Sequence, residues 1–168
     1  MRERWVQALM AAALLGPVPA VAQTAAPAPA ETPAPPPTPT PGPADAKVYF
    51  ISPTNGAILK APFLVQFGLR GMGVTQAGST APNAGHHHLF VDVDEPIAPN
   101  EVIPSDKTHL HFGAGQTETR LDLPPGRHTL QLVLGDAKHR PFSPILASQK
   151  ITVLVVTHLP KHRHHFHW

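Results

Sequence analysis

The sequence predicts an all-β protein, an immunoglobulin-like antiparallel β-sandwich of about seven to eight short strands. Short apolar runs, several with strict alternation of apolar and polar residues, recur through the middle of the chain. Glycine- and proline-containing turns separate these runs, and no stretch shows a helical period of useful length. Strands of this length and spacing are typical of two packed antiparallel sheets.

The expected strands follow one another between residues 47 and 156. The first, KVYFI, stops at SPTNG, where Asn55-Gly56 is a strong turn signal. The later strands are, in chain order, FLVQFGL, HHHLFVDV, THLHFG, ETRLDL, RHTLQLVLGD and QKITVLVV. The clearest alternation lies in RHTLQLVLGD, where every second residue from His128 to Leu134 shares one face.

The first 46 residues are predicted to lie outside the folded domain. Residues 1–22 have the order of a signal peptide, with early arginines, a short apolar stretch and small residues before the cleavage site. An uncleaved membrane anchor is the alternative. Residues 23–46, rich in Pro, Ala and Thr, cannot bury a core and predict a disordered linker. We therefore expect an exported protein, periplasmic or in the cell envelope, whose membrane contact is limited to its signal peptide or a tether.

The rest of the chain divides into one domain and a tail. Residues 47–157 form the only expected domain, of about the commonest domain size. Residues 158–168, HLPKHRHHFHW, carry five histidines and predict a disordered tail. This tail fits either loose capture of metal ions or a solvated basic segment.

Composition excludes several classes of function. The chain has no cysteine, which rules out disulfides, thiolate metal sites and a cysteine nucleophile. A net charge of +2 gives no argument for nucleic-acid binding. No serine–histidine–acid arrangement or phosphate-binding loop is evident, and we expect no catalysis. Histidine is the outlier, with 12 residues against one tyrosine, and imidazole is the commonest protein ligand for transition metals.

Two His-x-His pairs predict where a metal would bind. Alternation in HHHLFVDV divides the strand into a core face and a second face. The core face is expected to hold His87, Leu89, Val91 and Val93, and the second face His86, His88, Phe90 and Asp92. In HLHFG, His109 and His111 likewise share a face. Residues two apart on a strand lie about 6.5–7 Å apart at their bases, so their imidazoles can converge on one ion if the two strands are adjacent.

We therefore predict a copper or zinc site formed by His86, His88, His109 and His111, since only nitrogen and oxygen donors are at hand. Supporting roles are expected for His87, Asp136 and His139, because ligating imidazoles usually donate to a carboxylate or carbonyl. The alternative is a structural or interaction module whose histidines cap strand ends and hydrogen-bond the backbone. His128 is expected to be a hydrogen-bonded histidine at the rim of the core.

Three segments resemble a bacterial domain family. GHHHL at 85–89, HLHFGAGQTET at 109–119 and LPPGRHTLQLVLGDAKHRP at 123–141 are similar to the histidine motifs of an exported domain family without an assigned function. The resemblance covers about residues 48–155. It implies a small secreted β domain and supports His86, His87, His88, His109, His111 and His139 as the positions that matter.

Two looser likenesses imply different chemistry. SPTNGAILKAPFLVQFGL, LPPGRHTLQLVL and ITVLV are similar to segments of CopC-type periplasmic copper-binding β-sandwiches, but those proteins use a histidine at the mature N-terminus, where this chain has a proline-rich spacer. HHHLFVD and PPGRH resemble a cupin metal site, with His86, His88 and Asp92 followed by His128, although the spacing departs from the cupin pattern. A cupin-like metal-dependent enzyme is thus a further alternative.

Overall fold

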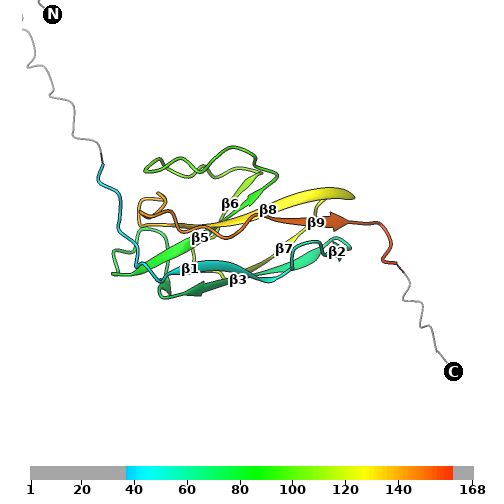
Figure 1. Cartoon of the computed structure of the whole chain (residues 1–168), viewed down its shortest axis with the longest axis horizontal. Coiled ribbons are helices and arrows are strands. Elements are labelled where there is room, and N and C mark those ends of the chain that lie inside the picture. The colour runs from blue at the N-terminus through cyan, green and yellow to red at the C-terminus, as the bar shows by residue number, and fades with distance from the viewer. Residues whose placement is uncertain (1–36, 161–168) are drawn as a thin grey trace, which may run out of the picture. The chain divides into compact units, whose positions relative to one another are not determined.

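The computed structural model describes residues 37–160, which contain strands and no helix (Figure 1). The expectations for the signal peptide, for linker residues 23–36 and for tail residues 161–168 lie outside this range. The strands of the described residues are β1 (Lys47–Ser52), β2 (Ile58–Leu59), β3 (Phe63–Arg70), β4 (Gly73–Val74), β5 (Ala84–Val91), β6 (His109–His111), β7 (Glu118–Leu121), β8 (Gly126–Gly135) and β9 (Ile151–Val155). Among these residues no helix is long and apolar enough to cross a membrane.

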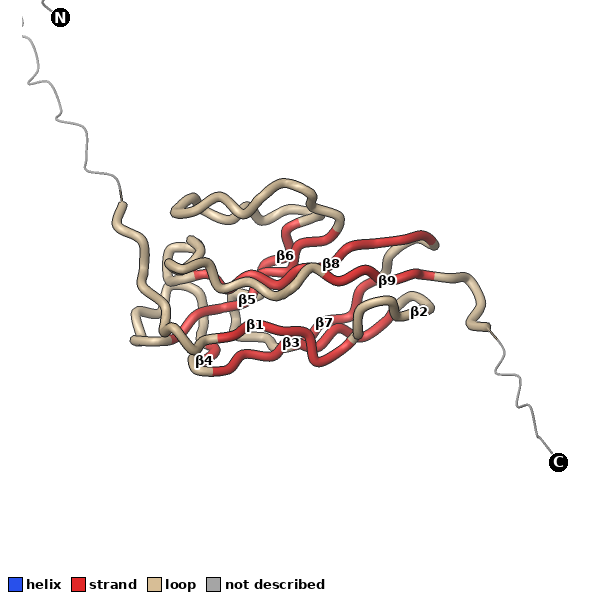
Figure 2. The backbone as a smooth tube through the Cα atoms, in the orientation of Figure 1, coloured by secondary structure: helices blue, strands red, loops and turns tan. Residues whose placement is uncertain are grey.

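The strands form two sheets, which confirms the predicted all-β sandwich (Figure 2). One sheet has the order β1-β3-β7, and the other has the order β2-β9-β8-β5-β4, with β6 also paired to β5. The long pairs are antiparallel, as expected. Two short pairs at the sheet edges, β2 with β9 and β4 with β5, are parallel. The prediction of antiparallel strands is wrong for these two pairs.

The main core lies between the two sheets. Val65 and Phe67 of β3 pack in one cluster with Leu89 of β5 and Leu132 of β8, and all four side chains are buried. Alternation produces this arrangement, because every second residue of each strand meets the facing sheet. Each fully buried leucine contributes about 1.5–3 kcal/mol relative to an exposed one.

A second apolar cluster covers the opposite face of β5 and β8. The loop between β5 and β6 lies over this face, and its Ile103 packs with Phe90, Val93 and Val133 (Figure 1). Val93 was expected on the inner face of the strand, and this prediction is wrong. The strand ends at Val91, and Asp92 has a positive φ of 56°, so the alternation stops before Val93. Because the main core covers one face of β5 and the loop covers the other, β5 is buried on both faces.

The folded domain begins earlier than residue 47. Gly42 donates its N–H to the Ser143 carbonyl, and the Ser143 N–H donates to the Thr40 carbonyl. Ala46 is buried in the main core. The end of the proline-rich segment therefore pairs with the chain that follows β8.

Candidate metal centre

β5 places His86 and His88 on the face turned away from the main core. The register of the sheet then selects their neighbours. His88 lies directly opposite His111 of β6, and His86 lies opposite Gly135 at the end of β8. The predicted adjacency of HHHLFVDV and HLHF is therefore present, and it brings together three of the four nominated histidines.

A fourth imidazole comes from the turn that follows β8. His139 has a positive φ of 61°, an uncommon conformation for a residue with a side chain. Asp136 builds this turn: its Oδ1 accepts the N–H groups of Lys138 and Arg140 at 2.8 and 2.9 Å, and its carbonyl accepts the His139 N–H. The Thr40 hydroxyl donates to Asp136 Oδ2. The backbone thus carries His139 back over the histidines of β5.

His86, His88, His111 and His139, hereafter the histidine cluster, surround one point. Their ring centroids lie 4.8 to 5.1 Å apart, except for the His88–His139 pair at 6.1 Å. One ring nitrogen from each of His86, His111 and His139 lies within 4.8 Å of the others. His88 Nε2 lies 3.1 Å from His86 Nε2. His88 is not part of this group of three, so three nitrogen donors already lie at metal-binding spacing and the His88 ring would complete the set by moving closer to His139.

Two glycines make room for these rings. A methyl group at Gly135 would lie 2.7 Å from His88 Nε2, and one at Gly113 would lie 2.3 Å from His111 Cε1. Real side chains do not approach so closely, because the repulsion at these distances is steep. Glycine at these two positions lets the imidazoles lie against the backbone of the neighbouring segments.

The cluster is buried and incompletely hydrogen-bonded. His86 and His88 are fully buried, and His111 and His139 are half-buried. His86 Nδ1, His88 Nδ1 and His111 Nε2 are shielded from solvent and have no hydrogen-bond partner among the described residues. Each unsatisfied buried polar atom costs about 1–3 kcal/mol. Such groups are rare in folded proteins, and a bound ion is one of the recognised reasons for them.

Burial keeps the imidazoles of His86, His88 and His111 neutral. It lowers the pKa of His86 to about 4, helped by the nearby His139 and His111, although Asp136 acts in the opposite direction. Burial, followed by His86, His111 and His139, lowers the pKa of His88 to about 3. The pKa of His111 is also lowered, first by burial and then by His139. Neutral imidazole is the form that binds metal, so at neutral pH no proton competes with an ion at these three rings.

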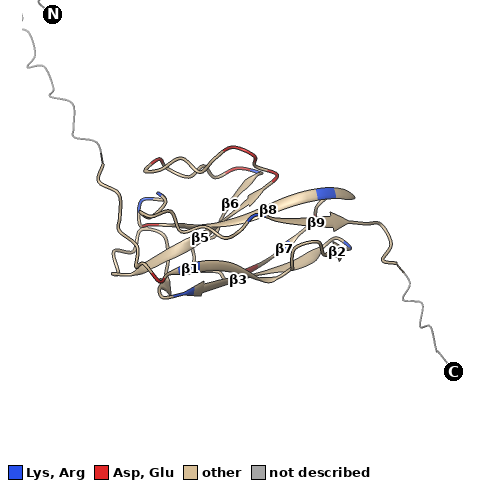
Figure 3. Ribbon diagram, viewed as in Figure 1, with Lys and Arg blue, Asp and Glu red and all other residues tan. Residues whose placement is uncertain are grey.

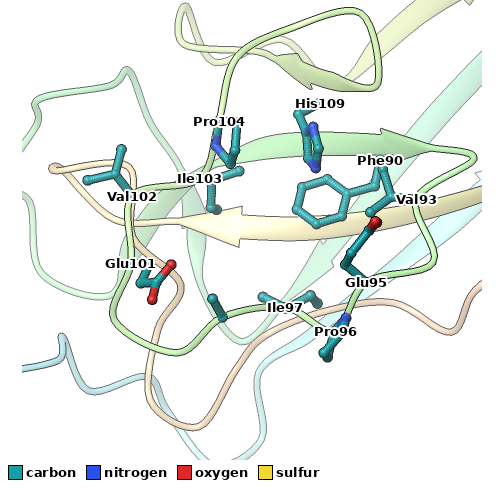
Figure 4. A pocket seen from close by; sticks show the side chains of 11 residues that line it. Phe90, Val93, Glu95, Pro96, Ile97, Glu101, Val102, Ile103, Pro104 and His109 are labelled. Atoms are coloured by element: carbon teal, nitrogen blue, oxygen red, sulfur yellow. The ribbon is translucent and has the colours of Figure 1, made fainter.

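His109 lies in different surroundings. It is paired with Phe90, their ring centroids are 4.6 Å apart, and its Nδ1 faces the Asp106 carboxylate at 3.0 Å. Together with Ile103 and Pro104 it lines an apolar pocket of about 200 Å³ under the loop between β5 and β6 (Figure 4). Among the described residues it belongs to no group of metal-spaced donors.

The other supporting residues lie as follows. His87 points into the main core, 5.3 Å from the Phe67 ring, and both its ring nitrogens lack a partner among the described residues. Burial lowers its pKa to about 4. Asp136 contacts no imidazole by a hydrogen bond and acts through the turn that carries His139. Burial alone would raise the pKa of Asp136, but hydrogen bonds from Thr40, Arg140 and Lys138 lower it, so the group stays anionic.

His128 fits the prediction of a hydrogen-bonded histidine at the core rim. Its Nδ1 lies 2.7 Å from Asp92 Oδ2 and its Nε2 lies 2.9 Å from the Pro124 carbonyl. Asp92 also accepts the Thr129 N–H, so its carboxylate is a partner of β8.

This position also separates His128 from the cupin-like set. His128 lies near the start of β8, whereas Gly135, the partner of His86, ends it. Seven residues of extended chain span about 23 Å. The described structure therefore does not assemble His86, His88 and His128 around one centre.

Sequence reasoning undervalued His139. It lies in GDAKHRP, outside any strand, so alternation assigns it no face. The available signal was the turn itself, since Gly135-Asp136 ends the clearest strand and an aspartate there commonly caps a turn. The partnership of that turn with β5 depends on the β5–β8 register.

Comparison with known proteins finds a family match. The family model described as "Domain of unknown function (DUF4399)" matches residues 65–156, more than half of the 168-residue chain. The match contains all four residues of the histidine cluster. No curated protein and no solved structure shows significant similarity to the chain.

Proposed function

This chain belongs to the DUF4399 family, and because that description names no activity, we propose a function from the site itself: the protein binds a divalent transition metal, zinc or copper, in the histidine cluster. The observation that carries the proposal is the set of four buried or half-buried imidazoles around one point, three of them with a shielded nitrogen that lacks a partner. A metal ion would take one nitrogen from each of these rings and so offset the desolvation of the coordinating atoms.

The proposed ligands differ from those the sequence suggests at one position. His139 replaces His109, while His86, His88 and His111 remain. Signal-peptide features and the proline-rich spacer support a protein that acts outside the cytoplasm, in the periplasm or cell envelope. The surface gives no competing indication of a nucleic-acid partner, because Lys and Arg are scattered over the described residues (Figure 3).

The rival function is a structural or interaction module whose histidines stabilise loops by hydrogen bonds. His128 and His109 behave in this way, with carboxylate partners at 2.7 and 3.0 Å. The histidine cluster does not: its only internal hydrogen bond joins His86 to His88. This contrast within one domain favours metal binding for the cluster.

Metal uptake by the cluster must be separated from uptake by the tail. The test protein is the full chain in which the tail histidines are replaced, hereafter the tail-substituted chain, carrying His158→Ala, His162→Ala, His164→Ala, His165→Ala and His167→Ala. After treatment with a chelator, it is dialysed against Zn²⁺ or Cu²⁺ and then against metal-free buffer. Elemental analysis should find one ion per chain.

The matched variants are His86→Gln and His109→Gln in the tail-substituted chain. His86→Gln should abolish stoichiometric uptake, whereas His109→Gln should leave it unchanged, because His109 contacts Phe90 and Asp106 instead. A tail-substituted chain that retains neither ion would refute the proposed function. Loss of uptake in His109→Gln together with normal uptake in His139→Gln would restore the ligand set suggested by the sequence.

A further inference from the structure

The spacing of the four rings decides between coordination geometries. Metal–nitrogen bonds of about 2.0–2.1 Å, with each nitrogen about 1.1 Å from its ring centre, place four tetrahedral imidazole centroids about 5.2 Å apart. In a square plane the same bonds give neighbours about 4.5 Å apart and two diagonals of about 6.4 Å. The two arrangements are therefore distinguished by their longest distances.

The histidine cluster matches the tetrahedral spacing in five of its six distances. These five lie between 4.8 and 5.1 Å, and only His88–His139, at 6.1 Å, is longer. If His88–His139 were one diagonal of a square, His86–His111 would be the other, yet these rings are 5.1 Å apart. A planar site would require His86 and His111 to separate by more than about 1 Å.

Such a separation meets resistance from the backbone. His86 and His88 lie on β5, whose register with β8 runs over six residue pairs, from His86 to Val91. His111 is paired directly with His88, and its ring lies over Gly113. A rotation of the His139 side chain toward His88 would shorten the one long distance and make the tetrahedron more regular.

We propose that the histidine cluster is a closed tetrahedral four-histidine site for Zn²⁺, in which all four coordination positions are taken by protein; this assignment rests on the proposed function. Tetrahedral nitrogen sites suit zinc, whereas Cu²⁺ and Ni²⁺ favour tetragonal arrangements. Cu⁺ prefers thioether or thiolate sulfur, and Met72, the one methionine of the described residues, packs against the main core. Mg²⁺ and Ca²⁺ require oxygen ligands, whereas the group of metal-spaced side-chain donors found among the described residues consists of imidazoles.

A closed site has a structural consequence. Zinc with four protein ligands has no open position for a water molecule or substrate, which is the pattern of structural rather than catalytic zinc. The ion would join three segments that are far apart in the sequence, namely β5, β6 and the turn at 136–140. In a chain without cysteine, it would serve as the cross-link that disulfides provide in other exported domains.

The test uses Co²⁺ as a spectroscopic substitute for zinc in the tail-substituted chain. Tetrahedral Co²⁺ absorbs visible light strongly and octahedral Co²⁺ only weakly, so a strong band that zinc removes stoichiometrically is the expected result. Competition between Zn²⁺ and Ni²⁺ should favour zinc by at least about tenfold, because nickel must distort the site or accept an unfavourable geometry. His109→Gln should leave both results unchanged.

Several outcomes would overturn the assignment. A weak Co²⁺ spectrum, a preference for Ni²⁺, or a Cu²⁺ complex with the paramagnetic resonance spectrum of a tetragonal centre would show that the cluster binds metal in another geometry, leaving the proposed function intact. Failure to retain Zn²⁺, Cu²⁺, Co²⁺ and Ni²⁺ alike would remove the proposed function and this inference together. Visible spectra and elemental analysis therefore separate the two claims.

Discussion

His88 of β5 and His111 of β6 are direct cross-strand partners, and their ring centroids lie 5.1 Å apart on the face of the sheet that points away from the main core. This pairing brings the two His-x-His motifs together. The same register places His109 opposite Phe90 and therefore not opposite a histidine of β5. The metal hypothesis therefore depends on a residue outside both motifs, and the predictions below begin with it.

His139→Gln in the tail-substituted chain should weaken zinc binding by more than about 100-fold. Losing even an outer residue that orients a ligand costs about 10–100-fold in affinity, and loss of a ligand should cost more. The matched control is Lys138→Gln, which changes an exposed residue of the same turn. This control should bind zinc as tightly as the tail-substituted chain does. Isothermal titration calorimetry measures both, and equal affinities would exclude His139 as a ligand.

In the tail-substituted chain, Gly135→Ala should reduce zinc affinity by at least about tenfold while the domain stays folded. The added methyl group would lie 2.7 Å from His88 Nε2, so the imidazole must turn away from its position in the cluster. Gly73→Ala is the control, because a methyl group there meets nothing closer than 3.8 Å. Circular dichroism checks that the domain is folded, and calorimetry measures the zinc affinity. Unchanged affinity in Gly135→Ala would show that the His88 ring need not lie over this glycine.

In the tail-substituted chain, Thr40→Val should lower zinc affinity by about tenfold, although Thr40 makes no hydrogen bond to an imidazole of the histidine cluster. Its hydroxyl donates to Asp136, whose other carboxylate oxygen holds the turn that carries His139, and orienting interactions of this kind are worth about 10–100-fold. Thr38→Val, an exposed threonine on the same segment, should have no effect. Competition with a zinc-sensitive dye compares the two. A Thr40→Val protein with normal affinity would mean that the turn holds its shape without this contact.

His128 predicts a pH-dependent contribution to stability. Both its ring nitrogens face acceptors, Asp92 Oδ2 and the Pro124 carbonyl, so both must donate and the ring is cationic. Burial alone would lower the pKa of His128, but the hydrogen bonds and charge of Asp92 together with the Pro124 carbonyl raise it above its ordinary value. A raised folded-state pKa stabilises the fold fully below the unfolded pKa of about 6.5, and this stabilisation is lost as pH rises through the folded value.

The measurement is the difference in unfolding free energy between the unmodified chain and His128→Gln, from urea titrations with chelator present. It should be about 1.5–3 kcal/mol near pH 6, the size typical of hydrogen bonds to a charged group, and should decline toward pH 9. In an Asp92→Asn background the slope should largely vanish, and asparagine tolerates the positive φ at this position. A difference that grows with pH would contradict the cationic assignment.

Local pattern in the sequence determined much of this protein. Alternation predicted the strands around His86 and His128, the absence of helix in the described residues, and the core positions of Leu89 and Leu132. It also divided His87 from His86 and His88, because successive strand residues point to opposite faces whatever the tertiary fold. The family match to residues 65–156 confirms the expected membership of a domain family without an assigned function.

The tertiary structure decided which residues meet. The positive φ of Asp92 ended the alternation before Val93, and the β5–β6 register paired His109 with Phe90. The turn built by Asp136 then carried His139 to the rings of His86 and His111, at 5.0 and 4.8 Å. Side-chain direction along a strand follows from local backbone geometry and can be read from the sequence. Convergence of four imidazoles from three distant segments depends on strand register and turn placement, which only the packed fold determines.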